Sequence, residues 1–245
     1  MTIAPQRPAG HDAPGRHHLF TPAEPMAPVA PVYSVPAQRG GPVAAEPFRI
    51  LFVCTGNICR SPSAELLTRH LLVGRVGGRT AARVQVSSAG VRAVVGASVH
   101  AQARAQLAPW GLDGEHAARF AARQLDASVV DGVDLVLGAT PRHRSAVLER
   151  FPHLLGATFS LREFARLAAL VDQDALPADL VERSRVLVGE ARRLRGTVAA
   201  PDDDRIPDPM GGSPEDFRRA TELTFDAVRS LMDVLAPRSA PAVAR

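Results

Sequence analysis

The chain has 245 residues, 46% of them hydrophobic, which is enough for one large domain or two small ones. Its 29 basic residues exceed the 25 acidic ones by only four, and the arginines are scattered among acidic residues rather than clustered with aromatic ones. This pattern argues against a nucleic-acid-binding protein. No apolar stretch resembles a signal peptide or a membrane span, and the two cysteines form no disulfide framework, so we expect a cytoplasmic protein without a membrane span.

The beginning of the chain differs in composition from the rest. Residues 1–46 are rich in Pro and Ala, as in P-A-E-P-M-A-P-V-A-P-V, and show no apolar periodicity. This composition predicts a disordered N-terminal extension, either a solvated tail or a docking segment. We also expect a disordered tail over residues 237–245, so the folded domain is predicted over residues 47–236.

The first structured element is a short apolar run over residues 50–53, which predicts a buried parallel strand that ends at Cys54. Gly56 and Asn57 tolerate left-handed backbone angles, and Ser61 is a good N-cap for the helical pattern that continues to about Gly74. The pattern therefore predicts a strand, a turn and a helix. The turn should curl over the helix N-terminus with its N–H groups pointing inward.

Such a turn is suited to binding an anion, because backbone donors and the positive end of the helix dipole converge there. Cys54 opens the turn and Arg60 follows six residues later. The same field favours the thiolate form of Cys54, and Arg60 offers a planar fork for two phosphate oxygens. The hydroxyl of Ser61 could donate to the sulfur. A thiolate beneath a bound phosphate is a nucleophile for phosphoryl transfer, whereas the alternative is a buried structural cysteine.

Two other readings of this turn are disfavoured by its spacing. Zinc sites usually have Cys-x2-4-Cys pairs with further ligands elsewhere, and nucleotide P-loops have a G-x-x-x-x-G-K-[ST] lysine. The string C-T-G-N-I-C-R-S-P has neither feature. The turn therefore indicates neither a metal site nor a nucleotide site.

The rest of the chain alternates strands and helices. Further strands are predicted over residues 84–90, 133–138 and 157–160, and helices over residues 99–112, 141–150, 161–171 and 180–195. This alternation predicts an α/β fold with a parallel sheet and right-handed crossovers. Ligands of such sheets bind beyond the carboxyl ends of the strands, where the first strand delivers Cys54. Residues 172–201 look like an inserted helical excursion.

An acidic, Pro- and Gly-rich loop over residues 201–212 precedes a long final helix over residues 214–235, capped by Ser213. Cleavage of a phosphate ester needs a proton on the departing oxygen, so the nucleophile needs a carboxylic acid as its partner. We select Asp208 because Pro207 and Pro209 fix its backbone. The alternative is a plain Asp-Pro turn.

Taken together, these motifs resemble the low-molecular-weight protein tyrosine phosphatase family of the bacterial type. The matching strings are V-C-T-G-N-I-C-R-S-P (53–62), S-S-A-G (87–90), A-R-Q-L (122–125), D-L-V-L (134–137) and I-P-D-P (206–209). The resemblance covers about residues 48–235 and is poor over the excursion. It implies a four-stranded parallel sheet flanked by helices, no metal or other cofactor, and hydrolysis of phosphotyrosine in proteins through a phosphocysteine intermediate.

The resemblance also implies a role for each site residue. Cys54 would be the nucleophile, Arg60 would bind phosphate and stabilise the transition state, and Asp208 would protonate the leaving group and later activate water. Asn57 and Ser61 would shape the loop, and Cys59 would form a reversible disulfide with Cys54 under oxidation. The substrate-binding residues would be Thr55, Gly56, Asn57, Ile58, Cys59 and Ser61. The implied partner is a phosphotyrosine-containing protein, with a bacterial tyrosine autokinase as one candidate.

Several positions depart from the family pattern. Met210 replaces an aromatic residue, residues 91–96 lack the aromatic wall of eukaryotic members, and Phe120 stands where many members have a histidine that braces the loop. Ile58, in place of a small threonine, favours phosphotyrosine over phosphoarginine, whose phosphatases resemble this family.

Two alternatives to the phosphatase interpretation remain open. An arsenate reductase of the same fold would resemble the family but carry redox cysteines downstream, and none follows Cys59. A non-catalytic phosphate-binding regulatory module would fit the departures at Met210 and Phe120.

Overall fold

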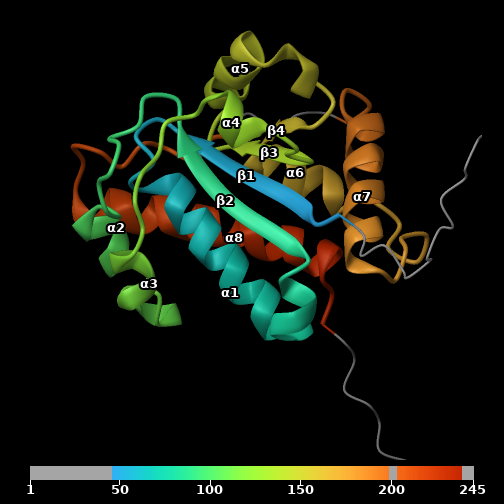
Figure 1. Cartoon of the computed structure of the whole chain (residues 1–245), viewed down its shortest axis with the longest axis horizontal. Helices are drawn as coiled ribbons and strands as arrows, with labels where there is room; N and C mark the ends of the chain where they lie inside the picture. Colours follow the sequence, from blue (N-terminus) through green and yellow to red (C-terminus); the bar gives the residue numbers. More distant parts are fainter. Residues whose placement is uncertain (1–45, 199–202, 239–245) are drawn as a thin grey trace, which may run out of the picture. The chain divides into compact units, whose positions relative to one another are not determined.

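The computed structural model describes residues 46–198 and 203–238 (Figure 1). The extension predicted over residues 1–46 and the tail predicted over residues 237–245 therefore lie largely outside the described residues. The strands are β1 (Phe48–Cys54), β2 (Val84–Gly90), β3 (Leu135–Gly138) and β4 (Thr158–Ser160). The helices are α1 (Arg60–Ala81), α2 (Ala101–Ala105), η1 (Ala108–Trp110), α3 (Glu115–Ala118), α4 (Ala127–Val130), α5 (Pro141–Arg150), η2 (Pro152–Leu154), α6 (Leu161–Ala168), α7 (Leu180–Leu194) and α8 (Pro214–Leu235).

The four strands form one parallel sheet in the order β2-β1-β3-β4, which confirms the predicted α/β fold class. The pairing places Cys54 beside Gly90 of β2 and Val53 beside Gly138 of β3. The chain goes from β1 to β2 on one side and later to β3 on the other. The carboxyl end of β1 is therefore the switch point of the sheet, where parallel α/β folds bind ligands.

Alternating side chains of β1 enter two separate layers of core. Phe52 and Cys54 belong to the layer with α1, α6 and α8, whereas Leu51 and Val53 pack with Val147 of α5 on the opposite face. Figure 1 shows α1 and α8 on one side of the sheet and α4 and α5 on the other. Because both faces of β1 are covered, its sequence is a continuous apolar run. Within the described residues, each helix is too short or insufficiently apolar to cross a bilayer.

The first helix begins and ends at different residues from those predicted. It starts at Arg60, so Cys59 occupies the N-cap position and Ser61 lies within the helix. The Ser61 hydroxyl contacts Asn57 and Cys54 instead of capping the backbone. The helix also continues past Gly74 to Ala81, with its only non-helical residue at Gly77, where φ is 73°.

The helix predicted over residues 99–112 is divided into α2 and η1. Pro109 cannot donate a backbone hydrogen bond, and Gly111 ends the segment with φ of 67° in the left-handed region. The cap predicted for the last helix is confirmed, because Ser213 caps α8 in a capping box with Asp216. The helix α5 begins at Pro141 as predicted, and Thr140 is its cap.

The excursion after α6 contains α7, which begins with Asp179 as its N-cap and matches the predicted helix within one residue. Arg183 of α7 is buried, and its Nε donates to the carbonyl of Val234 in α8 at 2.7 Å. The same guanidinium donates to carbonyls of the preceding turn, at Leu176 and Pro177. Hydrogen bonds of Arg183 thus connect the described part of the excursion to α8, the last helix of the domain.

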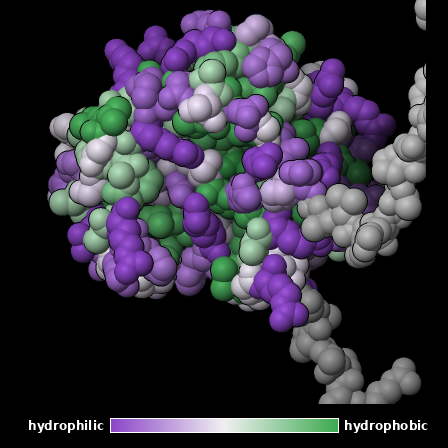
Figure 2. Space-filling model, viewed as in Figure 1, coloured by the Kyte–Doolittle hydropathy of each residue, from purple (hydrophilic) through white to green (hydrophobic). Residues whose placement is uncertain are grey.

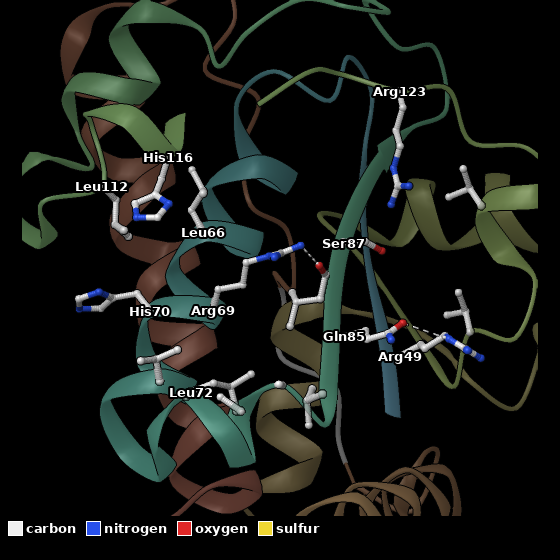
Figure 3. Close-up of a pocket in the computed structure, with 18 of the residues that line it drawn as sticks. Arg49, Leu66, Arg69, His70, Leu72, Gln85, Ser87, Leu112, His116 and Arg123 are labelled. Carbon is white, nitrogen blue, oxygen red and sulfur yellow. Dashed lines mark hydrogen bonds between the residues drawn. The ribbon is translucent and has the colours of Figure 1, made fainter. Parts of the chain in front are cut away.

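One edge of the sheet is β2, and a groove of about 980 Å³ runs beside it. Arg69 reaches from α1 and donates to the Val86 carbonyl, and Arg123 Nε donates to the Ser88 carbonyl at 2.8 Å. Figure 3 shows Arg69, Arg123 and Arg49 gathered along this strand, and Figure 2 shows apolar side chains at the surface between hydrophilic ones on the same face.

Candidate active site

The segment between β1 and α1 curls into a loop whose carbonyls point outward. The carbonyls accept backbone hydrogen bonds from outside the loop: Cys54 from Val91 (2.9 Å), Thr55 from Arg92 (3.0 Å), Gly56 from Val94 (3.0 Å), Ile58 from His100 (2.8 Å) and Cys59 from Ser63 (3.1 Å). In a trans peptide the N–H points opposite to the C=O, so the N–H groups that follow these carbonyls face the centre of the loop. The loop is therefore built to surround an anion at the N-terminus of α1.

Gly90 at the end of β2 allows the loop to lie close to the sheet. A Cβ atom at this position would come within 2.6 Å of the Thr55 carbonyl oxygen and 3.0 Å of the Asn57 nitrogen. Both contacts involve backbone, which cannot move aside without opening the loop. A residue without a side chain is thus required there.

Asn57 holds the loop in shape from within. It is fully buried and is the single non-glycine residue with positive φ, 56°, in the described chain. Its Nδ2 donates to the hydroxyls of Ser61 and Ser88, both at 2.9 Å, and its Oδ1 accepts from the Arg123 N–H at 2.9 Å. Three hydrogen bonds at one side chain therefore fix a backbone conformation that most residues avoid.

The sulfur of Cys54 faces the start of α1. Its Sγ lies 3.0 Å from the Ser61 Oγ. Because Ser61 accepts a hydrogen bond from Asn57, its own hydrogen can be donated to the sulfur. The other acceptor near this hydroxyl, the Ala89 carbonyl, is farther away at 3.5 Å. The geometry suits stabilisation of a thiolate by one short hydrogen bond.

Arg60 and Asp208 meet at the mouth of the loop. Arg60 Nη2 lies 2.6 Å from Asp208 Oδ2, and Nη1 donates to the Ile206 carbonyl at 3.3 Å. The Arg60 Nε is buried and has no hydrogen-bond partner within residues 46–198 and 203–238. The arginine side chain is 5% exposed and the aspartate side chain 46% exposed. Asp208 can therefore reach solvent or a ligand, while Arg60 keeps a donor available for an anion.

The loop that carries Asp208 is held by two arginines of α6. Arg162 Nη1 donates to the carbonyls of Asp203 (2.8 Å) and Arg205 (3.1 Å), and Arg166 pairs with Asp204 at 3.0 Å. These contacts fix the start of the loop a few residues before its acid. The position of Asp208 thus depends on contacts with α6, which lies far along the chain from Cys54.

Cys59 differs from Cys54 in its surroundings, although both thiols are free. Burial, with smaller contributions from the nearby Cys54 and Asp208, raises the pKa of Cys59 to about 12 against the opposing effect of Arg60. Its Sγ lies 3.4 Å from the Sδ of Met210, the residue that replaces the expected aromatic side chain. Cys59 is therefore a protonated thiol at neutral pH.

His143 is a site residue that the sequence did not indicate. Its Nε2 lies 3.0 Å from the Thr55 Oγ1 and its Nδ1 lies 2.8 Å from the Thr140 Oγ1. Burial and the charge of Arg60 lower its pKa to about 4, so the imidazole is neutral. The helix start at Thr140-Pro141 was visible in the sequence, but the contact with Thr55 spans 88 residues and left no local signal.

The departures from the family pattern fall at two sides of the loop. A Cβ at Gly56 would contact Ile58 (3.4 Å) and Val94 (3.7 Å), so these two aliphatic side chains lie together beside the loop. Phe120 is partly buried and packs against the main core cluster. The brace comes from Asn57 and the backbone N–H of Arg123.

Comparisons with known proteins agree with the fold and the loop. Residues 49–175 match the family model described as low molecular weight phosphotyrosine protein phosphatase. A protein-arginine-phosphatase of Geobacillus stearothermophilus is 32% identical over 193 residues, which is 78% of this chain and 96% of the relative. A probable low molecular weight protein-tyrosine-phosphatase, EpsP of Ralstonia solanacearum, is 37% identical over 115 residues, or 46% of this chain and 70% of the relative.

Solved structures give the same result for the fold. The structure of YwlE arginine phosphatase from Geobacillus stearothermophilus is similar with a TM-score of 0.54 at 29% identity, covering 76% of this chain and 92% of that one. A low molecular weight protein tyrosine phosphatase from T. tengcongensis has the same fold, with a TM-score of 0.54 at 23% identity over 76% of this chain and 98% of its own.

Proposed function

The chain belongs to the low molecular weight phosphotyrosine protein phosphatase family, and from this membership we propose that it hydrolyses phosphotyrosine in proteins through a phosphocysteine intermediate. The observation that carries the proposal is the loop that begins at Cys54, whose carbonyls accept hydrogen bonds from outside so that its N–H groups face inward. A dianionic phosphate placed there would lie over a nucleophile and beside a guanidinium.

The first step forms a bond between the Cys54 sulfur and phosphorus and breaks the bond between phosphorus and the phenolic oxygen. Arg60 changes partner from Asp208 to the phosphate, whose oxygens also meet its unpartnered Nε. Freed from the guanidinium, the Asp208 carboxylate binds a proton from solvent and, as the carboxylic acid, gives it to the departing oxygen. The inward N–H groups stabilise the charge on the equatorial phosphate oxygens.

The second step reverses the roles of these groups. Water attacks phosphorus, its proton passes to the Asp208 carboxylate, and the phosphorus–sulfur bond breaks to release inorganic phosphate and the Cys54 thiolate. The Ser61 hydroxyl, held by Asn57, supports the sulfur as a leaving group. Neither step needs a metal or a cofactor.

The test of this proposal compares leaving groups. Wild type, Cys54→Ser and Asp208→Asn are assayed with aryl phosphates of graded phenol acidity. We expect Cys54→Ser to be inactive and Asp208→Asn to lose about 10²- to 10⁴-fold with poor leaving groups but much less with good ones. Equal rates for wild type and Cys54→Ser would refute the covalent route, and a uniform loss in Asp208→Asn would refute its role as the acid.

A second candidate substrate is phosphoarginine, because a relative named protein-arginine-phosphatase aligns over nearly its whole length. We place phosphotyrosine first because Ile58 and Val94 offer an aliphatic surface beside the loop, which suits an aromatic ring. Parallel assays with phosphotyrosine and phosphoarginine in one peptide sequence decide between them. A higher kcat/KM for phosphoarginine would reverse the order.

Two earlier alternatives lack support. An arsenate reductase would need a further thiol, and the chain has no cysteine after Cys59. A non-catalytic module would not need the acid, the guanidinium and the sulfur together at one loop.

The proposal also covers the cellular location of the enzyme, its partner and its domain boundaries. Both cysteines are free thiols and the nucleophile must stay reduced, so we propose a cytoplasmic location. A protein tyrosine autokinase remains the candidate partner. We further propose that residues 47–236 form the phosphatase domain, with residues 172–201 as an excursion that begins near the end of the matched family region.

A further inference from the structure

The cleft at the mouth of the loop has charged walls that the reaction does not use. It encloses about 690 Å³ and is bordered by Arg60 and Asp208 on the inside. Three more arginines line it: Arg92 follows β2, Arg142 lies in the first turn of α5, and Arg205 precedes the acid. Arg92 and Arg142 are exposed, and neither forms a salt bridge with any residue in the described ranges.

The other charges of the cleft are already paired. Asp208 contacts Arg60 at 2.6 Å, and Arg205 contacts Asp203 at 2.9 Å. His143 is neutral at physiological pH because its pKa is about 4. The positive charge that remains at the cleft therefore comes from Arg92 and Arg142.

Arg142 occupies a position that the helix itself disfavours. The N-terminus of α5 carries the positive end of the helix dipole, and its first turn contains no acidic residue to offset a cation. The same helix carries another exposed arginine, Arg150, in its last turn, where the dipole favours a cation. An arginine at the positive end of a helix dipole, beside a phosphate-binding cleft, indicates a negatively charged ligand that offsets both positive charges.

We propose that Arg92 and Arg142 are specificity-determining residues that select phosphorylated residues flanked by carboxylate side chains. This inference rests on the proposed phosphatase function and names its substrate class. Both residues belong to segments outside the phosphate loop, so we assign them to the neighbours of the phosphorylated residue rather than to the reacting phosphate. Each can hold a carboxylate in a bidentate contact. No Phe, Tyr or Trp of the described residues lines this cleft, so ion pairs with Arg92 and Arg142 would contribute part of the substrate binding.

The experiment measures the ratio of kcat/KM for two phosphotyrosine peptides, one flanked by Asp and Glu and one flanked by Ala. Exposed ion pairs are worth up to about fivefold each, so we expect wild type to prefer the acidic peptide by about tenfold at low salt. Because screening weakens exposed pairs, the ratio should fall below about threefold in about 0.5 M NaCl. In the double variant Arg92→Gln/Arg142→Gln the ratio should approach one.

The matched control is Arg150→Gln, which removes the same charge from the same helix away from the cleft. It should keep the wild-type ratio. Equal kcat/KM for the two peptides in wild type, or a ratio unchanged in the double variant, would overturn the inference while leaving the phosphatase proposal intact. If wild type hydrolysed neither the peptides nor p-nitrophenyl phosphate, the proposed function would fail and this inference with it.

Discussion

Replacing Asn57 by alanine tests whether one side chain holds the phosphate loop. The change removes three hydrogen bonds at 2.9 Å and leaves the backbone N–H of Arg123 without its acceptor. At about 1 kcal/mol for each bond the loss is roughly 3 kcal/mol. Alanine at φ of 56° adds about 1 kcal/mol of backbone strain. We therefore expect Asn57→Ala to lower the free energy of unfolding by about 3–5 kcal/mol.

The assay is urea unfolding at equilibrium, followed by kcat with an aryl phosphate. Asn57→Gly removes the same hydrogen bonds but accepts the positive φ, so it should be no less stable than Asn57→Ala. Ser87→Ala on β2 is the control, because its hydroxyl makes a single bond of 3.4 Å to the Ile50 carbonyl and should cost less than about 1 kcal/mol. Both Asn57 variants should also lose more than about tenfold in kcat, since Ser61 is no longer oriented toward the sulfur.

A loss of less than about 1 kcal/mol in Asn57→Ala would refute the reasoning. It would mean that the loop keeps its shape through its backbone contacts alone. An unchanged kcat together with reduced stability would mean that Asn57 stabilises the fold but does not help to position the groups around Cys54.

Three further outcomes follow from the site. Burial and Arg60 hold the pKa of His143 near 4, whereas His143 in the unfolded chain binds a proton below about pH 6.5. The free energy of unfolding should therefore fall by on the order of 3 kcal/mol as the pH drops from 6.5 to 4. In urea unfolding, His143→Gln should flatten this pH dependence. Because its pKa is about 12, Cys59 should resist iodoacetamide at pH 7.5 while Cys54 reacts; equal labelling of the two in mass spectra would contradict this. Arg162→Ala removes two hydrogen bonds to the loop that carries Asp208, so kcat should drop about three- to tenfold for aryl phosphates with poor leaving groups and less for those with good ones. A loss of stability without that leaving-group dependence would assign Arg162 a purely structural role.

The sequence predicted best those elements whose ends carry their own local chemistry. The helix α5 begins at Pro141 after Thr140, and α8 begins at Pro214 after Ser213, because a hydroxyl cap and a proline at the first position determine the start. The predicted start of α1 was wrong because the Ser61 hydroxyl, which the sequence indicated as an N-cap, contacts Asn57 and Cys54 instead.

The site was predicted unevenly. The nucleophile and the arginine lie on one continuous string, so their relation could be predicted from spacing. Asp208 was chosen as the acid from its Pro-flanked loop and from the resemblance, but its contact with Arg60 spans a long stretch of sequence and was not predicted. The contact of His143 with Thr55 could not be predicted, since histidine after a strand has no distinctive pattern and its neutrality depends on burial and on a distant charge.

The arginines along β2 have a consequence for the behaviour of the protein at high concentration. An uncovered outer strand normally offers its backbone to a strand of another molecule and so starts aggregation. Here the guanidinium groups of Arg69 and Arg123 already occupy two outward carbonyls, and an incoming chain would have to displace both cations. We therefore expect these side chains to hinder pairing with a strand of another molecule along the part of this edge that lies before the Gly90–Gln124 bridge.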